Sequence, residues 1–237
     1  RNYQPLFPFL DEFDQRGYGG YFHFTLTGYG PPLERCAPAV PKMIDVFKAL
    51  ADRYSPQHVL WRFDPILLSN RTPPDFILAT FEQLARQLHG STERCYVSFV
   101  DFYRKTEKNL RLLEEQGVQV SDPPLAAKIE LTERLVTLGH NYGIRLYACC
   151  EPDLLDIPGL QQAHCVDPLL IQQLFPQKFQ RLKAAPTRKG CGCFASRDIG
   201  AYDTCVHGCA YCYANSRYEA ALRRYRSHDP ESPCLGE

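Results

Sequence analysis

Three cysteines near the C-terminus are the residues whose types and spacing most clearly indicate chemistry. Cys205, Cys209 and Cys212 follow the pattern C-x3-C-x2-C, with Tyr211 directly before the last cysteine. A [4Fe–4S] cluster in a protein usually takes four cysteine thiolates. A loop that supplies only three leaves one iron unligated, and open coordination positions are where metal chemistry takes place. The spacing therefore predicts an iron–sulfur cluster with one open iron.

Zinc binding and unliganded thiols are the alternatives for this loop. A structural zinc site needs four ligands, and His207 or Cys193 could supply the fourth. Spacing favours iron and sulfide over zinc, but all three possibilities stay open at this point. The other histidines show no ligand-like spacing, and we expect them to be satisfied surface or core residues.

Two further cysteines, Cys191 and Cys193, come shortly before the loop. Only one residue separates them, which is too close for comfortable chelation of one metal in a strand. They could bind a second cluster together with Cys165 or Cys234, or they could be free thiols near the site.

The adjacent residues Cys149 and Cys150 end a predicted strand. Neighbours on a strand point to opposite faces, so at most one of them can point into a barrel. We expect the other, like Cys36 and Cys95, to be a small core hydrophobe, because free cysteine is among the most buried residue types.

The wording of the loop, Cys205-Val206-His207-Gly208-Cys209-Ala210-Tyr211-Cys212-Tyr213, resembles the cluster loop of radical S-adenosylmethionine (SAM) enzymes, in their photolyase-like branch. A longer match resembles an uncharacterised bacterial family that carries such cysteines at its C-terminus. It comprises Cys191-Gly192-Cys193, Ser196, Asp198-Ile199-Gly200, Tyr202, Thr204-Cys205 and Asn215, together with residues 24–27, 61–66 and 98–101. The resemblance therefore spans nearly the whole chain.

This resemblance implies two cofactors, a [4Fe–4S] cluster and SAM. In radical SAM enzymes the cluster passes one electron to SAM, which is cleaved to methionine and a 5′-deoxyadenosyl radical that abstracts hydrogen from a substrate. We therefore expect an enzyme that receives electrons from a donor such as a ferredoxin or flavodoxin, with its substrate unknown. A non-catalytic module with structural zinc and an electron-transfer iron–sulfur protein are the alternatives.

Short apolar runs alternate with amphipathic segments through the first three quarters of the chain. The apolar runs 21–27, 59–64, 95–101 and 144–151 are typical of buried parallel strands. Helical periodicity covers 40–54, 72–90, 105–116 and 122–143, and a further helix is expected over 217–226. A fifth strand is expected over 199–204, leading into the cysteine loop.

This alternation predicts an α/β fold, a partial (β/α) barrel of the TIM or radical SAM type. We expect residues 1–186 to form the barrel and residues 187–237 to form a cysteine-rich segment packed in the same domain. The chain begins without Met, so we expect upstream residues to add strands.

Polar residues at the predicted strand ends lie where a (β/α) barrel places its active site. Arg62 and Asp64 share one strand face, and Asp101 and Glu151 end two further runs. These four could bind SAM or a substrate, because a charge within an apolar strand is costly unless it is paired or functional. The alternative is an internal ion-pair network that holds the barrel together.

Charge and composition exclude several classes of function. The chain has 27 basic and 27 acidic residues, and this balance argues mildly against the nucleic-acid partner at which the photolyase-like wording hints. It contains no run of 18 apolar residues and no signal peptide, so no membrane association is expected. Five of its eleven cysteines lie within 191–212, which favours metal binding in a reducing, cytoplasmic compartment over a disulfide scaffold.

Overall fold

A parallel sheet forms the centre of the protein. The computed structural model describes residues 1–102, 104–178 and 182–232. The sheet has five strands, in the order β1 (Phe22–Thr25), β2 (Val59–Arg62), β4 (Arg94–Val97), β6 (Arg145–Ala148) and β7 (Leu160–Gln162). Every neighbouring pair is parallel. All carboxyl ends therefore meet at one edge of the sheet, and side chains that follow these strands are brought together there.

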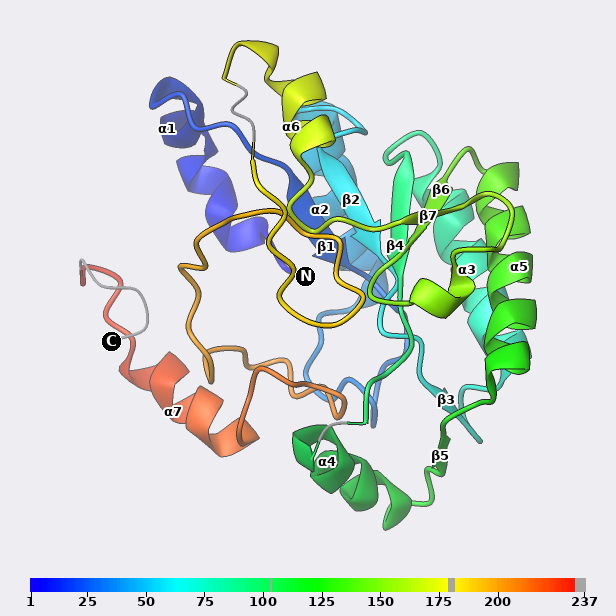
Figure 1. Ribbon diagram of the computed structural model, residues 1–237. Helices are drawn as coiled ribbons and strands as arrows, with labels where there is room; N and C mark the ends of the chain where they lie inside the picture. The colour runs from blue at the N-terminus through cyan, green and yellow to red at the C-terminus, as the bar shows by residue number, and fades with distance from the viewer. Residues whose placement is uncertain (103, 179–181, 233–237) are drawn as a thin grey trace.

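Helices connect the strands, namely α2 (Val40–Arg53), α3 (Pro74–Leu88), α4 (Arg104–Glu114) and α5 (Leu125–Asn141). Of these, α2, α3 and α5 cover one face of the sheet, and α4 lies beyond the carboxyl edge (Figure 1). The outlying helices are α1 (Leu10–Gln15), α6 (Pro168–Leu174) and α7 (Tyr218–Ser227), and short 3₁₀ turns occupy Gln4–Phe9, Pro152–Leu154 and Pro176–Lys178. A small antiparallel pair, β3 (Leu68–Ser69) with β5 (Val120–Ser121), lies beyond the carboxyl edge.

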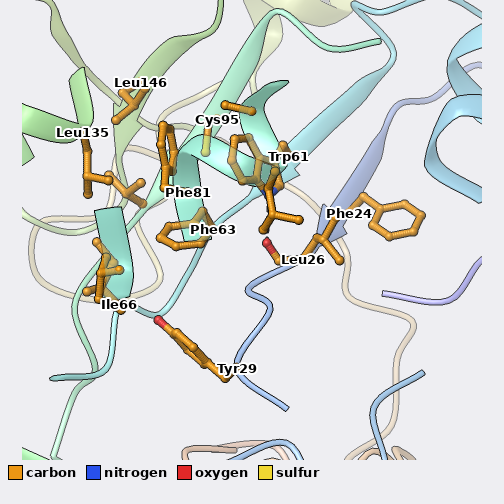
Figure 2. Packing of buried hydrophobic residues seen from close by; sticks show 14 of the residues in the cluster. Phe24, Leu26, Tyr29, Trp61, Phe63, Ile66, Phe81, Cys95, Leu135 and Leu146 are labelled. Carbon is orange, nitrogen blue, oxygen red and sulfur yellow. Dashed lines mark hydrogen bonds between the residues drawn. The ribbon is translucent and has the colours of Figure 1, made fainter. Parts of the chain in front are cut away.

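Aromatic side chains fill the core between the sheet and its helices (Figure 2). Trp61 on β2 stacks on Phe81 of α3 with ring centroids 4.8 Å apart, and Phe63 meets the same ring edge-on at 5.2 Å. Trp61, Phe63 and Phe81 are all fully buried. Aromatic pairs at these separations add to the free energy gained by burying their area. This core fixes β2 and the position of the residues that follow it.

The opposite face of the sheet is covered by α6 and the segment before it. Tyr96 and Tyr147 pack there with Leu170 of α6 in a second buried cluster that also contains Cys149. The Tyr21 hydroxyl donates to the Cys165 carbonyl at 2.8 Å and accepts from the Asp167 amide at 2.9 Å. The segment after β7 therefore crosses this face of the sheet toward β1, and Asp167 pairs there with Arg94, the first residue of β4.

The C-terminal segment begins without helix or strand and wraps beside the sheet until it reaches α7 (Figure 1). An isolated bridge joins Ala184 to Phe194 within it, and another joins Glu34 to Cys209 of the cysteine loop. In the portion of the chain that the structure covers, no helix has the length and apolar character needed to cross a membrane.

The α/β class, four predicted strands and the five predicted helices are confirmed, with shifted boundaries. The predicted strand over 199–204 is wrong, because those residues are described and form no strand. Ile199 is 70% exposed and Tyr202 is 61% exposed, so this run has no surface to bury against. The fifth strand of the sheet is β7, which the apolar pattern missed because Gln161 and Gln162 are exposed.

Candidate functional site

The cysteine loop is held by its backbone against the segment that follows β1. The Ala210 amide donates to the Leu33 carbonyl at 2.9 Å, and the Cys36 amide donates to the His207 carbonyl at 2.8 Å. Because β1 ends at Thr25, this segment starts at the carboxyl edge of the sheet. The loop is therefore placed at the edge where an α/β fold positions functional residues.

A buried carboxylate, Glu34, holds the loop through a hydrogen bond from the Tyr211 hydroxyl. Its side chain is 3% exposed, and its Oε1 accepts hydrogen bonds from the Tyr211 hydroxyl, from the Thr27 hydroxyl and, at 2.6 Å, from Arg1. The same Arg1 donates to the Tyr211 hydroxyl at 3.1 Å. Desolvation acts to raise the pKa of Glu34, but hydrogen bonds and the charge of Arg1 outweigh it and lower that pKa. The network fixes Tyr211 between Cys209 and Cys212.

The three loop thiols lie within electrostatic range of one another. Burial raises the pKa of Cys209 to about 12; the charge of Arg1 opposes this, and Cys212 and Cys205 add to it. The Cys205 thiol is exposed and lies 3.3 Å from Nδ1 of His207. Among the residues that the structure describes, no three or more His, Cys, Asp or Glu side chains are already arranged to hold a metal ion. The described loop thus carries its three thiols close together in sequence, but they are not arranged around a common metal position.

The turn of the loop depends on Gly208. This residue has φ +63°, and a Cβ added there would meet the Tyr218 ring at 3.2 Å. Only glycine adopts such a backbone conformation without a steric penalty. Gly208 therefore lets the chain reverse between Cys205 and Cys209.

Asn215 closes the loop from its C-terminal side. Its Nδ2 donates to the Cys205 carbonyl at 2.6 Å, which fixes the orientation of the side-chain amide. Its Oδ1 is buried and has no hydrogen-bond partner within the described part of the chain. A buried polar atom without a partner is costly, so Oδ1 is an acceptor available to a ligand beside Cys205.

The predicted strand-end residues lie in two places. Arg62 and Asp64 form a largely buried ion pair, in which Arg62 Nε donates to Asp64 Oδ1 at 2.9 Å and to Oδ2 at 3.1 Å. Tyr213, at the end of the cysteine loop, is within electrostatic range of this pair and of Cys212. The ion pair that the sequence left as an alternative is therefore present, close to the loop.

Asp101 and Glu151 lie together farther along the same edge. Asp101 pairs with Arg188 of the C-terminal segment, and Glu151 accepts a hydrogen bond from the Phe99 amide at 2.7 Å. Burial raises the pKa of Glu151, and the charge of Asp101 acts in the same direction. These two acids are thus engaged by the protein itself.

A second gathering of thiols follows strands β6 and β7. Cys149 Sγ lies 4.0 Å from Cys165 Sγ, and the Cys165 amide donates to Cys193 Sγ at 3.2 Å. Cys191 and Cys150 adjoin this group. The sequence suggested Cys165 as a companion of Cys191 and Cys193, but it did not identify the pairing with Cys149.

The other cysteines divide between core and surface. Cys95 is fully buried, as expected of a core hydrophobe, whereas the same expectation for Cys36 is wrong because that residue is exposed next to the Tyr218 hydroxyl. The ten cysteines of the described ranges are all free thiols. Cys234 lies outside the residues that the structure describes.

His23 on β1 makes the stability of the fold depend on pH. Its Nε2 donates to the Cys165 carbonyl at 2.9 Å, and its buried Nδ1 has no partner among the described residues. Burial and then the charge of Arg62 lower the pKa of His23 below its ordinary value of 6.5. His23 therefore binds a proton at higher pH in the unfolded chain than in the folded one. Its contribution to the free energy of unfolding is fully present above pH 6.5 and is lost as the pH falls below that value.

We expect His23→Gln to flatten this acid dependence, since the amide keeps a donor for the Cys165 carbonyl and does not titrate. Chemical denaturation across this pH range should show that the wild type loses up to about 1.4 kcal/mol more per pH unit than the variant. His228→Gln, at an exposed position, is the matched control and should follow the wild type. Parallel pH profiles for wild type and His23→Gln would contradict the assignment.

A family model described as a domain of unknown function, DUF1848, matches residues 1–214. The match includes the cysteine loop, the Arg62–Asp64 pair and the second group of thiols. No curated protein matches the chain. No solved structure matches it either.

Proposed function

The chain belongs to the DUF1848 family, and from this premise we propose that it is an iron–sulfur protein whose loop binds a three-cysteine [4Fe–4S] cluster for radical SAM chemistry. The ligands would be Cys205, Cys209 and Cys212. One observation carries the proposal. The loop with the C-x3-C-x2-C cysteines packs on the buried carboxylate of Glu34, at the carboxyl edge of a parallel sheet.

The donor set fits such a cluster. Thiolates are the soft ligands that iron–sulfur clusters take, and three of them in one short loop leave one iron for another ligand. Metal binding deprotonates thiols, so it must overcome the burial that raises the pKa of Cys209, a rise that the Arg1 charge opposes. When bound and reduced, such a cluster supplies one electron for the cleavage of SAM.

The chain's own residues would bind and orient SAM next to the loop. Arg62 and Asp64 offer opposite charges within electrostatic range of Tyr213, at the end of the loop, which suits the carboxylate and ammonium groups of one amino acid moiety. Asn215 Oδ1 would accept from an N–H group of the same ligand, since it has no other partner in the described ranges. Asp101 and Glu151 would then hold the edge of the sheet through Arg188 and the Phe99 amide, and would not touch SAM.

The same proposal extends to the architecture and the setting. The consecutive strand order is also that of a (β/α) barrel, so the sheet within residues 1–186 would be an arc of a barrel. The described part of the segment 187–237 would lie over its opening. A ferredoxin or flavodoxin in a reducing, cytoplasmic environment would supply the electrons. The substrate would be a small molecule or a part of a larger one that reaches the carboxyl edge.

Structural zinc is the second candidate, and one observation favours it. His207 Nδ1 lies 3.3 Å from Cys205 Sγ, so a Cys₃His set could close around a single ion. In that case the loop would stabilise the C-terminal segment and catalyse nothing.

One experiment separates these possibilities. The protein is reconstituted anaerobically, iron, sulfide and zinc are measured, and dithionite and SAM are added before an assay for 5′-deoxyadenosine. We expect iron and sulfide near four of each per cluster, with deoxyadenosine formed. Iron without deoxyadenosine would leave an electron carrier. One equivalent of zinc that Cys205→Ala removes, in protein purified without oxygen, would establish the structural site at the loop instead.

A further inference from the structure

We propose that the protein has a second metal centre, a tetrahedral thiolate site for one thiophilic divalent ion such as Zn²⁺ or Fe²⁺, formed by Cys149, Cys165, Cys191 and Cys193. It lies at the carboxyl edge of the sheet, apart from the Cys205–Cys212 loop. The site goes beyond the proposed function, because its ligands come from other segments and its test does not depend on SAM.

Direct contacts connect the four cysteines across three segments of the chain. Cys149 follows β6 and Cys165 follows β7, and their sulfurs are 4.0 Å apart. Cys193 Sγ accepts from the Cys165 amide at 3.2 Å, and Cys191 Sγ accepts from the Cys193 amide at 3.4 Å. Four free cysteines joined by one thiol–thiol contact and two amide–sulfur hydrogen bonds are not explained by core packing, because Cys165 and Cys191 are only partly buried.

The sulfur spacing points to a single ion. A zinc–sulfur bond is about 2.3 Å, which places two tetrahedral sulfurs about 3.8 Å apart. The 4.0 Å between Cys149 and Cys165 matches that edge. Cysteines that bind different irons of a cluster lie farther apart, since the irons themselves are separated. Cys149 and Cys165 thus provide one edge of the tetrahedron. Among the described residues no set of ligands already surrounds one point, so Cys191 and Cys193 would complete the site by rotating their side chains when the ion binds.

The backbone at Gly192 allows the segment with Cys191 and Cys193 to lie close to the segment that follows β7. A Cβ on Gly192 would lie 2.7 Å from His164 Nδ1, so only glycine lets Cys191 and Cys193 reach the segment after β7. His164 Nδ1 donates a hydrogen bond to the Gly192 carbonyl, which holds the two segments together. Cys150, beside Cys149, has φ +59°, a strained conformation for a side-chain-bearing residue that is typical of functional sites.

Arg62 supplies positive charge to two of the proposed ligands, and Arg188 contacts the cysteine beside one of them. Arg62 Nη1 donates to Cys165 Sγ at 3.1 Å, and its Nη2 lies 3.8 Å from Cys149 Sγ. Arg188 Nε donates to Cys150 Sγ at 3.0 Å. Four thiolates around a divalent ion carry a net negative charge, and hydrogen bonds from cations to metal-bound sulfur are the outer contacts that such sites use.

Cobalt titration of the reduced protein tests this centre. The full chain carrying Cys205→Ala, Cys209→Ala and Cys212→Ala removes the loop site, and Co²⁺ serves as the probe because tetrahedral thiolate coordination gives intense visible bands. We expect these bands to saturate at one equivalent of Co²⁺ and to disappear when Zn²⁺ is added. Adding Cys149→Ser and Cys165→Ser should weaken Co²⁺ binding at least tenfold, whereas adding Cys95→Ser, at a core cysteine, should leave it unchanged.

Two results would overturn the proposal. One is the absence of thiolate bands in a loop variant whose circular dichroism is that of the wild type. The other is a saturable band that survives Cys149→Ser with Cys165→Ser. If the loop variant does not fold, the same pair of serines is placed in the wild type, where it must remove one equivalent of Co²⁺ and leave the other. Failure of SAM cleavage would not change the expected result of any of these cobalt titrations.

Discussion

Replacing Cys209 by Ala is expected to abolish retention of the iron–sulfur cluster by the anaerobically reconstituted protein. Cys209 is the middle ligand of the proposed trio, and two remaining thiols cannot hold three irons of a cluster. We expect sulfide to fall to background and iron to fall by the content of one full cluster, with loss of the cluster's visible colour. The measurement is iron and sulfide per protein after desalting without oxygen.

Cys36→Ser is the matched control for this variant. Cys36 is an exposed cysteine whose amide contacts the loop at the His207 carbonyl, yet it has no place in the C-x3-C-x2-C pattern. We expect it to retain full iron. A Cys209→Ala protein that keeps its iron and colour would remove the loop from the proposed function.

Glu34→Ala is expected to destabilise the fold by about 3 to 5 kcal/mol, because it leaves the charge of Arg1 and two hydroxyl groups buried without their shared acceptor. Glu34 is 3% exposed and holds Tyr211 between two loop cysteines. Urea denaturation of the metal-free protein measures this change without any contribution from a cluster.

Glu93→Ala is the comparison at a surface position. Glu93 pairs with Arg145 at 3.2 Å, and both side chains are more than one-third exposed, so its loss should cost less than about 1 kcal/mol. Equal and small effects of the two substitutions would mean that the Glu34 network does not anchor the loop.

The sheet could be predicted because its strands are short, continuous apolar runs that both faces bury. Val59, Leu60 and Trp61 are fully buried, and such a run has few alternatives to a parallel central strand. β7 could not be predicted because only Leu160 of its three residues is buried, and the neighbouring strand β6 decides its pairing. The run 199–204 has apolar residues but nothing to pack against, which only tertiary structure reveals.

The loop cysteines could be found from spacing alone, because their ligand pattern is local. Glu34 could not, since a carboxylate in a loop sequence is normally a surface residue, and its burial depends on Tyr211, far away in the chain. Cys149 and Cys165 meet because two parallel strands end side by side, and their meeting also depends on the fold. Arg62 and Asp64 were recognisable as neighbours, because residues two apart share a strand face.

The open iron itself can be tested by electron paramagnetic resonance of the dithionite-reduced protein, recorded anaerobically with and without saturating SAM. The proposed function predicts a [4Fe–4S] signal that SAM alters in the wild type, because SAM takes the position that the three cysteines leave free. A cluster signal that saturating SAM leaves unchanged, in protein shown to contain a full cluster, would contradict it.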